Sequence, residues 1–390
     1  MQGYKALREV VQKEIDDPMT GRSGIYVFDL KKQREVIQRA AEEQFLIASL
    51  TKIFTIGAAL EHLGAKATFR TKLVATAPIN GDGTLHGDLN VIGGGDPTLG
   101  TSEHVQKLYG DRGTRVEKIV EEIKRAGVQR VTGQLIGDGS LFDQTDTRHT
   151  NWITALSFNR TRSKQPVLEA TRAIMEALNS AGVAVEQGFA ESRAPTEGIE
   201  IGIIESPTVR ELAIFSGHES DNFISEILAK QVASSASKQI TSNTAHGCTI
   251  IEQHANNLGA TINLLNGSGL KKIYQGEASG NTATPREVVN YLASVANQQN
   301  RWQLEETLPR AAAEGTLKTR MRNTAAAERV RAKTGTLTLE RKPLQDSLAG
   351  YCIGKRRSLA FAVIYEEAET RFVARSSIDR IMDTLARYCA

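Results

Sequence analysis

The hydrophobic pattern of the chain changes twice, and this double change constrains the fold more than any other feature. Between about residues 67 and 205, short β-like runs alternate with glycine-rich turns. From Pro207 onward, a helical spacing of apolar residues resumes. The sequence therefore predicts a smaller β-rich domain, residues 67–205, inserted into a domain made of residues 1–66 and 206–390.

The two ends of the chain are expected to share one sheet. Residues 24–30 and 35–40 read as a pair of strands, and residues 329–367 contain three further runs that alternate like neighbouring antiparallel strands. A helix at each chain end and a strongly apolar helix near residues 50–60 are available to cover that sheet. This order predicts an α+β fold in which an antiparallel sheet has helices on both faces, and not a βαβ alternation.

Charge and cysteine content exclude several classes of protein. The 390 residues include 48 Lys and Arg against 45 Asp and Glu, without a basic block, so no nucleic-acid partner is expected. The three cysteines have no metal-ligand spacing, so we expect neither a metal nor another cofactor. The longest apolar stretch, residues 47–60, is too short for a transmembrane segment, and the first residues show no signal peptide.

The first candidate for chemistry is Ser49-Leu50-Thr51-Lys52. It places a hydroxyl and an amine three residues apart at the start of a helix, on one face and within reach of each other. A lysine that burial keeps neutral can take the proton of a serine and make it a nucleophile. An SxxK pattern alone is weak, because it occurs by chance in many chains and is then usually an N-cap serine followed by a solvated lysine. A lysine in the least polar helix of the chain favours the functional interpretation.

Two further motifs follow in chain order. Ser220-Asp221-Asn222 offers a hydroxyl and a carboxamide on one turn, able to relay a proton and to bind a substrate amide. Lys333-Thr334-Gly335-Thr336 begins a predicted strand whose edge can dock a peptide. Taken singly, each has a structural explanation: Ser220 as a helix N-cap, and Lys333 as a charge that protects an edge strand from aggregation.

The ordered set SxxK, SDN and KTG is the signature of penicillin-binding proteins and class A β-lactamases. With it, the chain resembles the D-alanyl-D-alanine carboxypeptidase/endopeptidases of the class C low-molecular-mass penicillin-binding proteins, the DacB-like group. The likeness extends to GGGDPTL (93–99), GQLIGDGSLFD (133–143), NGSGL (266–270) and SLAGY (347–351). The resemblance implies a β-lactamase/DD-peptidase-like sheet, peptidoglycan stem peptides as substrates and β-lactam antibiotics as covalent inhibitors.

The resemblance also implies roles for individual residues. Ser49 attacks the carbonyl between two D-alanines with Lys52 as the base, and Ser220, connected to Lys333, returns a proton to the leaving amine. The backbone N–H groups of Ser49 and Thr336 form the oxyanion hole. The implied substrate-binding residues are Asn222 for the peptide amide, and Lys333, Thr334, Gly335 and Thr336 for the terminal carboxylate. Asp143 or Asp146 is implied for a cationic side chain such as that of diaminopimelate. Ser268 and Lys272 are two further substrate-binding residues.

The chain departs from the family in two places. The stretch between Ser49 and Ser220 is short, so the innermost of the nested insertions common in the family is expected to be missing. Where the family usually has DGSGLSR, this chain has NGSGLKK, so Lys272 replaces an arginine that helps bind the substrate side chain. Lysine offers a point charge and lacks the planar, two-pronged donor group of an arginine. The change therefore bears on side-chain specificity and not on the reaction.

Two other functions share these motifs. One is an esterase or β-lactamase of the same fold, and the other is a non-catalytic protein that binds penicillin or the cell wall. In class A β-lactamases a glutamate after the SDN motif activates the deacylating water. The corresponding stretch here, residues 249–263, contains one carboxylate, that of Glu252, which is expected on a solvated helix face. We therefore predict that β-lactams inhibit the protein and are not destroyed efficiently.

The expected compartment follows from the substrate. Peptidoglycan stem peptides lie outside the cytoplasmic membrane, so the protein is expected in the periplasm or cell envelope, with an export signal that this chain does not show. No transmembrane segment is expected.

Overall fold

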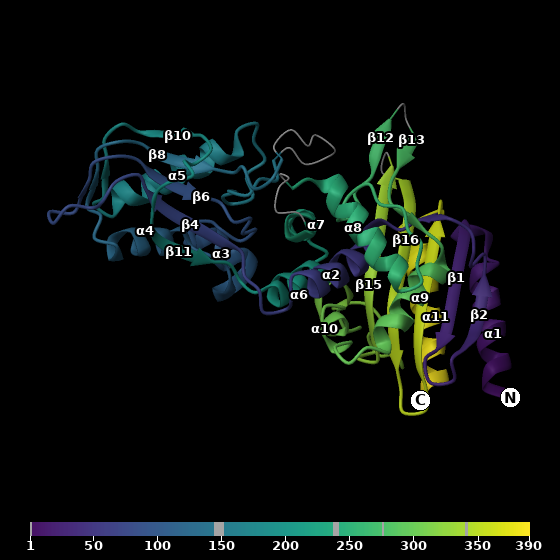
Figure 1. Cartoon of the computed structure of the whole chain (residues 1–390). Helices are drawn as coiled ribbons and strands as arrows, with labels where there is room; N and C mark the ends of the chain where they lie inside the picture. The colour runs from purple at the N-terminus through teal and green to yellow at the C-terminus, as the bar shows by residue number, and fades with distance from the viewer. Residues whose placement is uncertain (1, 144–151, 237–241, 275–276, 340–341) are drawn as a thin grey trace. The chain divides into compact units, whose positions relative to one another are not determined.

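The computed structural model describes residues 2–143, 152–236, 242–274, 277–339 and 342–390. They form two compact units (Figure 1). The first unit comprises residues 1–62, 213–229 and 247–390, and the second comprises residues 63–212 and 230–246. The domain boundaries inferred from the sequence stay a prediction.

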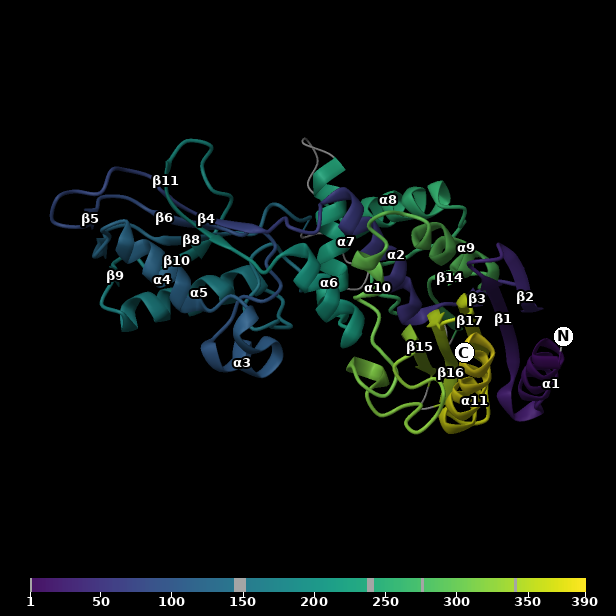
Figure 2. The same ribbon diagram turned by 90° about the horizontal axis from the view of Figure 1, so that it is seen from below.

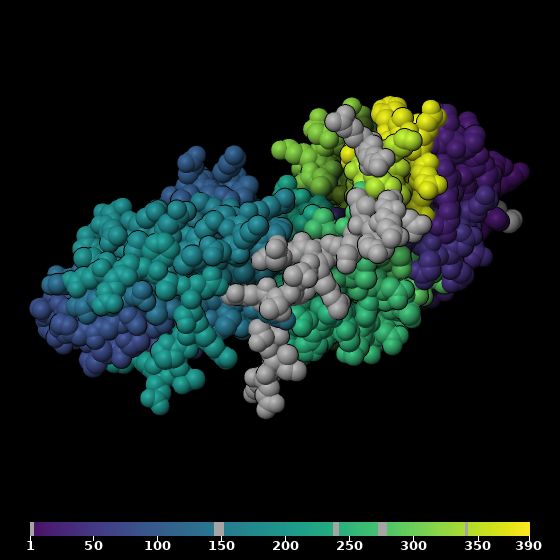
Figure 3. Space-filling view, turned by 90° about the horizontal axis from the view of Figure 1, so that it is seen from above, coloured from purple at the N-terminus to yellow at the C-terminus, as the bar shows by residue number. Residues whose placement is uncertain are grey.

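The first unit is built on a five-stranded antiparallel sheet in the order β15-β16-β17-β1-β2. Its strands come from both ends of the chain, and the purple N-terminal and yellow C-terminal segments lie side by side in Figure 3. The strands are β1 (Arg22–Asp29), β2 (Arg34–Arg39), β15 (Val330–Leu339), β16 (Lys342–Ile353) and β17 (Ser358–Glu366), and short pairs are β3 (Phe45–Leu46) with β14 (Thr282–Ala283) and β12 (Lys272–Tyr274) with β13 (Glu277–Ser279).

Helices cover both faces of this sheet (Figure 2). On one face, α11 packs against β16 and β17 and against α1, and on the other α9 packs against β1, β16 and β17. The apolar stripe of α11, with Ile378, Ile381 and Leu385, buries against the sheet. The helices that contribute to this unit are α1 (Gln2–Ile15), α2 (Thr51–His62), α6 (Val209–His218), α7 (Asn222–Ala236), α8 (Thr244–Asn257), α9 (Pro285–Ala296), α10 (Trp302–Glu305) and α11 (Arg371–Cys389).

The second unit contains a mixed five-stranded sheet in the order β10-β8-β6-β4-β11 and a parallel three-stranded sheet, β5-β7-β9. Two amphipathic helices, α4 and α5, contribute apolar residues to its core. The elements are β4 (Arg70–Ala75), β5 (Thr84–Leu85), β6 (Leu89–Ile92), α3 (Ser102–Tyr109), α4 (Val116–Arg125), β7 (Arg130–Val131), β8 (Leu135–Asp138), α5 (Pro166–Ser180), β9 (Ala184–Val185), β10 (Phe189–Glu191) and β11 (Ile199–Glu205).

The predicted α+β class, with an antiparallel sheet covered by helices on both faces, is confirmed. Among the described residues, none of the helices combines the length and apolar character needed to cross a membrane.

Candidate active site

Ser49 lies in a single 3-10 turn, Ala48–Leu50, that leads directly into α2. This turn is fixed by a close backbone approach from the NGSGL segment. Gly269 has a φ of +84°, and a Cβ built on it would lie 1.8 Å from the carbonyl oxygen of Ala48. Only glycine fits there, because any side chain would displace the backbone that presents Ser49. Ala48 itself has a φ of 45°, an unusual conformation for a residue with a side chain.

Lys52 is fully buried on α2 and connects three parts of the first unit. Its Nζ lies 2.9 Å from Ser49 Oγ and donates to Asn222 Oδ1 at 2.7 Å and to the carbonyl oxygen of Ser268 at 2.6 Å. Burial lowers the pKa of Lys52 to about 7, against the opposing effect of the carboxylates of Glu226 and Asp221. A neutral amine at this distance can accept the proton of Ser49.

Lys333 and Ser220 form a second lysine–serine pair. Lys333 Nζ donates to Ser220 Oγ at 2.9 Å and to the carbonyl oxygen of Thr334 at 2.9 Å, while the lysine side chain is almost completely buried. Burial, with a contribution from the nearby charge of Lys52, lowers the pKa of Lys333 well below its usual value. Ser220 has a φ of 56°, so its hydroxyl is presented from a strained backbone just before α7.

A buried carboxylate that the sequence analysis did not single out lies beside these groups. Glu226 is one turn beyond Asn222 on α7 and is completely buried. It accepts hydrogen bonds from the backbone N–H of Ser268 at 2.9 Å and of Gly267 at 3.2 Å. Glu226 therefore fixes the segment whose carbonyl oxygen binds Lys52. The available sequence signal was a carboxylate inside the apolar run NFISEIL.

Both pairs face one cavity of about 420 Å³ in the first unit. Its lining is strongly polar and includes the predicted residues Ser49, Ser220, Asn222, Thr334 and Thr336. Gly335 lies between the last two on the edge strand β15, where a Cβ would meet Ser347 Oγ at 2.3 Å. The sequence analysis did not single out the other lining residues, which are Thr316, Arg320, Arg371 and Arg375.

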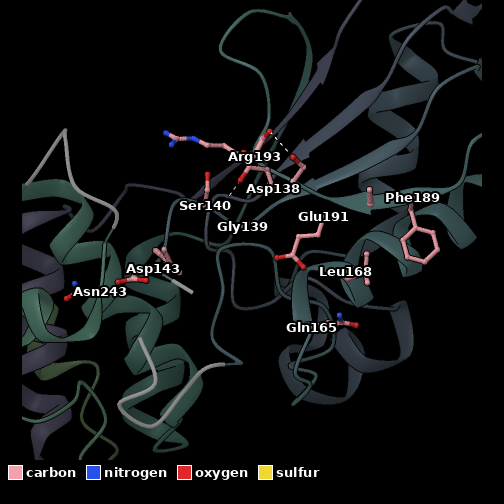
Figure 4. A pocket seen from close by; sticks show the side chains of 13 residues that line it. Asp138, Gly139, Ser140, Asp143, Gln165, Leu168, Phe189, Glu191, Arg193 and Asn243 are labelled. Carbon is pink, nitrogen blue, oxygen red and sulfur yellow. Dashed lines mark hydrogen bonds between the residues drawn. The ribbon is translucent and has the colours of Figure 1, made fainter. Parts of the chain in front are cut away.

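The residues proposed for the substrate side chain are placed differently. Asp143 lines a cavity of about 1100 Å³ in the second unit, together with Asn243, Glu191 and Arg193 (Figure 4). Asp146 lies outside the described residues. Lys272 begins β12, and only its backbone belongs to the described part of the chain.

The expectation for Glu252 is wrong. Its side chain is half-buried on α8, and Oε1 accepts a hydrogen bond from the backbone N–H of Leu264 at 2.6 Å. Burial raises the pKa of this carboxyl group. Glu252 therefore fixes the loop after α8 and is not among the residues that line the cavity of Ser49.

The sequence and the fold of the chain are similar to those of known proteins. The sequence model of a family described as D-Ala-D-Ala carboxypeptidase 3 (S13) matches residues 7–158 and 154–388. A carboxypeptidase from Mycobacterium tuberculosis is 28% identical over 383 residues, which cover 90% of this chain and 78% of that protein. A D-alanyl-D-alanine carboxypeptidase from an Actinomadura species is 26% identical over 459 residues, which cover 92% of this chain and 80% of that protein.

A solved structure shares the fold. Penicillin binding protein 4 (dacB) from Haemophilus influenzae matches with a TM-score of 0.79 and 19% identity, and the match covers 97% of this chain and 98% of that one. The same Haemophilus protein has also been solved in complex with a β-lactam. The Actinomadura alignment is longer than the 390 residues of this chain, so that relative has residues with no counterpart here.

Proposed function

This chain belongs to the D-Ala-D-Ala carboxypeptidase 3 (S13) family of serine hydrolases, and we propose that it removes the terminal D-alanine of peptidoglycan stem peptides through an acyl-enzyme on Ser49. One observation carries the assignment of residues. Two buried lysines with lowered pKa values, Lys52 and Lys333, each lie 2.9 Å from a serine hydroxyl that lines the same cavity.

Acylation uses the first pair. Neutral Lys52 takes the proton of Ser49 Oγ, and the oxygen attacks the carbonyl carbon of the penultimate D-alanine. The backbone N–H groups of Ser49 and Thr336 stabilise the oxyanion, and removal of one such donor costs about 3 kcal/mol. Both residues line the cavity, which supports this placement.

Release of the leaving group uses the second pair. When the C–N bond breaks, the amine of the departing D-alanine takes a proton from Ser220 Oγ, which Lys333 orients through their hydrogen bond. The proton that Lys52 took from Ser49 then restores the Ser220 hydroxyl, so that Lys52 is neutral again. Asn222, fixed by Lys52, binds the amide of the substrate. Water then attacks the ester on Ser49, and Lys52 accepts the proton of the water and returns it to Ser49 Oγ as the C–O bond breaks.

The same chemistry accounts for inhibition by β-lactams, in keeping with the β-lactam complex of the Haemophilus protein. Among the described residues that line the cavity there is no carboxylate to activate a deacylating water. The opened β-lactam retains its leaving group, which blocks the approach of water. A rise of about 8 kcal/mol in the deacylation barrier relative to a β-lactamase slows release about a millionfold.

The substrate defines the compartment. Stem peptides are found outside the cytoplasmic membrane, so we place the protein in the periplasm or cell envelope. Fractionation of the natural host tests this, and recovery of the protein in the cytosol would contradict it.

Two substrates test the proposed reaction against its alternatives. We expect continuous release of D-alanine from an acylated D-alanyl-D-alanine peptide, and with nitrocefin a burst equal to the enzyme concentration followed by almost no turnover. Steady hydrolysis of nitrocefin at many turnovers per second would indicate a β-lactamase. Binding of penicillin without a covalent bond would indicate a non-catalytic protein.

A further inference from the structure

Two arginines of one helix line the cavity that contains Ser49. Arg371 and Arg375 lie one turn apart at the start of α11, so both project from the same face of the helix. Their side chains are 44% and 41% exposed, so both remain accessible where they line the cavity. Positive charge in the first turn of a helix is unfavourable unless a negative group compensates it.

That negative group is Asp346 on β16, directly opposite Thr336 in the sheet register. Its side chain is almost completely buried, and Oδ1 lies 3.3 Å from Nε of Arg375 and 3.9 Å from Nε of Arg371. A single carboxylate therefore positions two cations. Together, the two arginines and Asp346 have a net charge of +1 when the aspartate is ionised. The two arginines line the cavity, whereas Asp346 does not.

The hydroxyl groups expected to bind the terminal carboxylate of the substrate already donate hydrogen bonds to other side chains of the protein. Thr336 Oγ1 donates to Asp346 Oδ1 at 3.2 Å, and Thr334 Oγ1 donates to Thr316 Oγ1 at 3.0 Å. A hydroxyl has one proton to donate, so neither can also donate to a substrate without losing its partner. Arg320, the third arginine of the cavity, is paired with Asp379: its Nη2 and Nε both donate to Asp379 Oδ1, at 2.6 and 3.1 Å.

Arg375 is placed to supply the missing donors. Its Nη2 donates to Thr336 Oγ1 at 3.4 Å, which brings the guanidinium to the residue whose backbone N–H we assign to the oxyanion hole. A guanidinium has five N–H donors in a planar fork that matches a carboxylate, and it stays charged at every pH at which the enzyme works. Lys52 can therefore be neutral as a base while the cavity keeps its positive charge.

Building on the proposed function, we infer that Arg371 and Arg375 bind the carboxylate of the departing D-alanine. This contact makes the site prefer substrates that end in a free carboxylate. Asp346 is a positioning residue that orients both guanidinium groups. The pair thereby favours a carboxypeptidase reaction over cleavage of an internal peptide bond, where the leaving group has no carboxylate at this place.

The test compares two acyl-D-alanyl thioesters that differ only in the leaving group, mercaptoacetate or its methyl ester. Both are reactive enough to be turned over without the carboxylate contact. The ratio of their kcat/KM values is measured for the wild type, for the double variant Arg371→Gln/Arg375→Gln and for Arg387→Gln. Arg387 is a control on the same helix that pairs with Asp383 and does not line the cavity.

We expect the double variant to lose about 100-fold in kcat/KM for the mercaptoacetate thioester, mainly through KM, with the methyl ester changed less than threefold. The control should keep the wild-type ratio. An unchanged ratio in the double variant would overturn the inference. If the glutamine variant does not fold, Arg371→Lys/Arg375→Lys takes its place, and its ratio should fall several-fold because lysine lacks the fork; an unchanged ratio again overturns it.

These results are separate from a failure of the proposed function. If the wild type forms no acyl-enzyme on Ser49 with benzylpenicillin, the proposed reaction is wrong. If it forms that adduct and the arginine variants still keep the wild-type ratio, the reaction stands and only the carboxylate assignment fails.

Discussion

The two units each contain a cavity, and the larger one is not the one with the reactive groups. The cavity of the second unit measures about 1100 Å³, and its buried carboxylate, Asp138, accepts hydrogen bonds from the backbone N–H groups of Ser140 and Ala194 at 2.7 and 2.8 Å. The cavity beside Ser49 in the first unit measures about 420 Å³ but borders two buried lysines paired with serines. Reactivity follows from charged groups that the fold forces into a dry environment, and not from volume.

The largest expected effect separates the two cavities directly. Ser49→Ala should reduce release of D-alanine from an acylated D-alanyl-D-alanine peptide by about 10⁵-fold, because no other group can form the acyl-enzyme. The matched variant is Ser140→Ala, a half-buried serine in the lining of the larger cavity. It should stay within twofold of the wild type. Comparable losses in both variants would remove the distinction between the cavities.

The backbone next to Ser49 gives the second test. Gly269→Ala should lower the rate of acylation by benzylpenicillin about 100-fold, since its Cβ would collide with Ala48 and displace the nucleophile. Gly259 is the control: its φ is +80°, but a Cβ there would meet no atom within 4 Å. Gly259→Ala should cost about 1–2 kcal/mol of stability and leave the acylation rate unchanged. Equal acylation rates in the two variants would contradict the role of Gly269.

The pH dependence of acylation sharpens the role of burial. Lys52 acts as a base only when it is neutral, so the rate should fall about tenfold per pH unit below a midpoint near the pKa of about 7. Glu226 raises the pKa of Lys52, so Glu226→Gln should move the midpoint to lower pH. Glu252→Gln, a half-buried carboxylate on α8, should leave it in place. The measurement is the second-order rate of benzylpenicillin acylation between pH 5 and 9, and a midpoint that rises in Glu226→Gln would refute the assignment.

The smallest effect concerns the second unit. If Asp143 binds a cationic side chain of the stem peptide, Asp143→Asn should lower kcat/KM about fivefold for a peptide with a free side-chain amine. The same peptide with an acetylated amine should react equally with both enzymes. A loss that is the same for both peptides would show that Asp143 has no part in side-chain recognition.

The sequence predicts which of these side chains the fold brings together, because the SxxK, SDN and KTG motifs each combine a polar side chain with a defined place at a helix start or strand edge. Ser49, Lys52, Ser220 and Lys333 are brought together as those motifs indicate. The sheet shared by both chain ends was also predictable, since its strands alternate and its helices have apolar stripes.

Other parts of the site depend on tertiary contacts that no local pattern encodes. Glu226 gains its importance only because α7 places it under the Gly267–Ser268 backbone. Arg371 and Arg375 are ordinary helical cations in the sequence, and only the pairing of β15 with β16 brings Asp346 beside Thr336 to position them.

The boundaries of the inserted domain, residues 67–205, also remain a proposal. Limited proteolysis should cut first near these boundaries and leave three fragments, residues 1–66, 67–205 and 206–390, of which the first and the last stay associated as one domain. Early cuts at sites away from these boundaries would contradict the proposal.

The most direct test of the central claim is the intact mass of the protein after incubation with benzylpenicillin, followed by peptide mapping. We expect one adduct per chain, on Ser49, that is absent from Ser49→Ala and forms slowly in Lys52→Met. An unmodified mass, or an adduct on any other residue, would contradict the account.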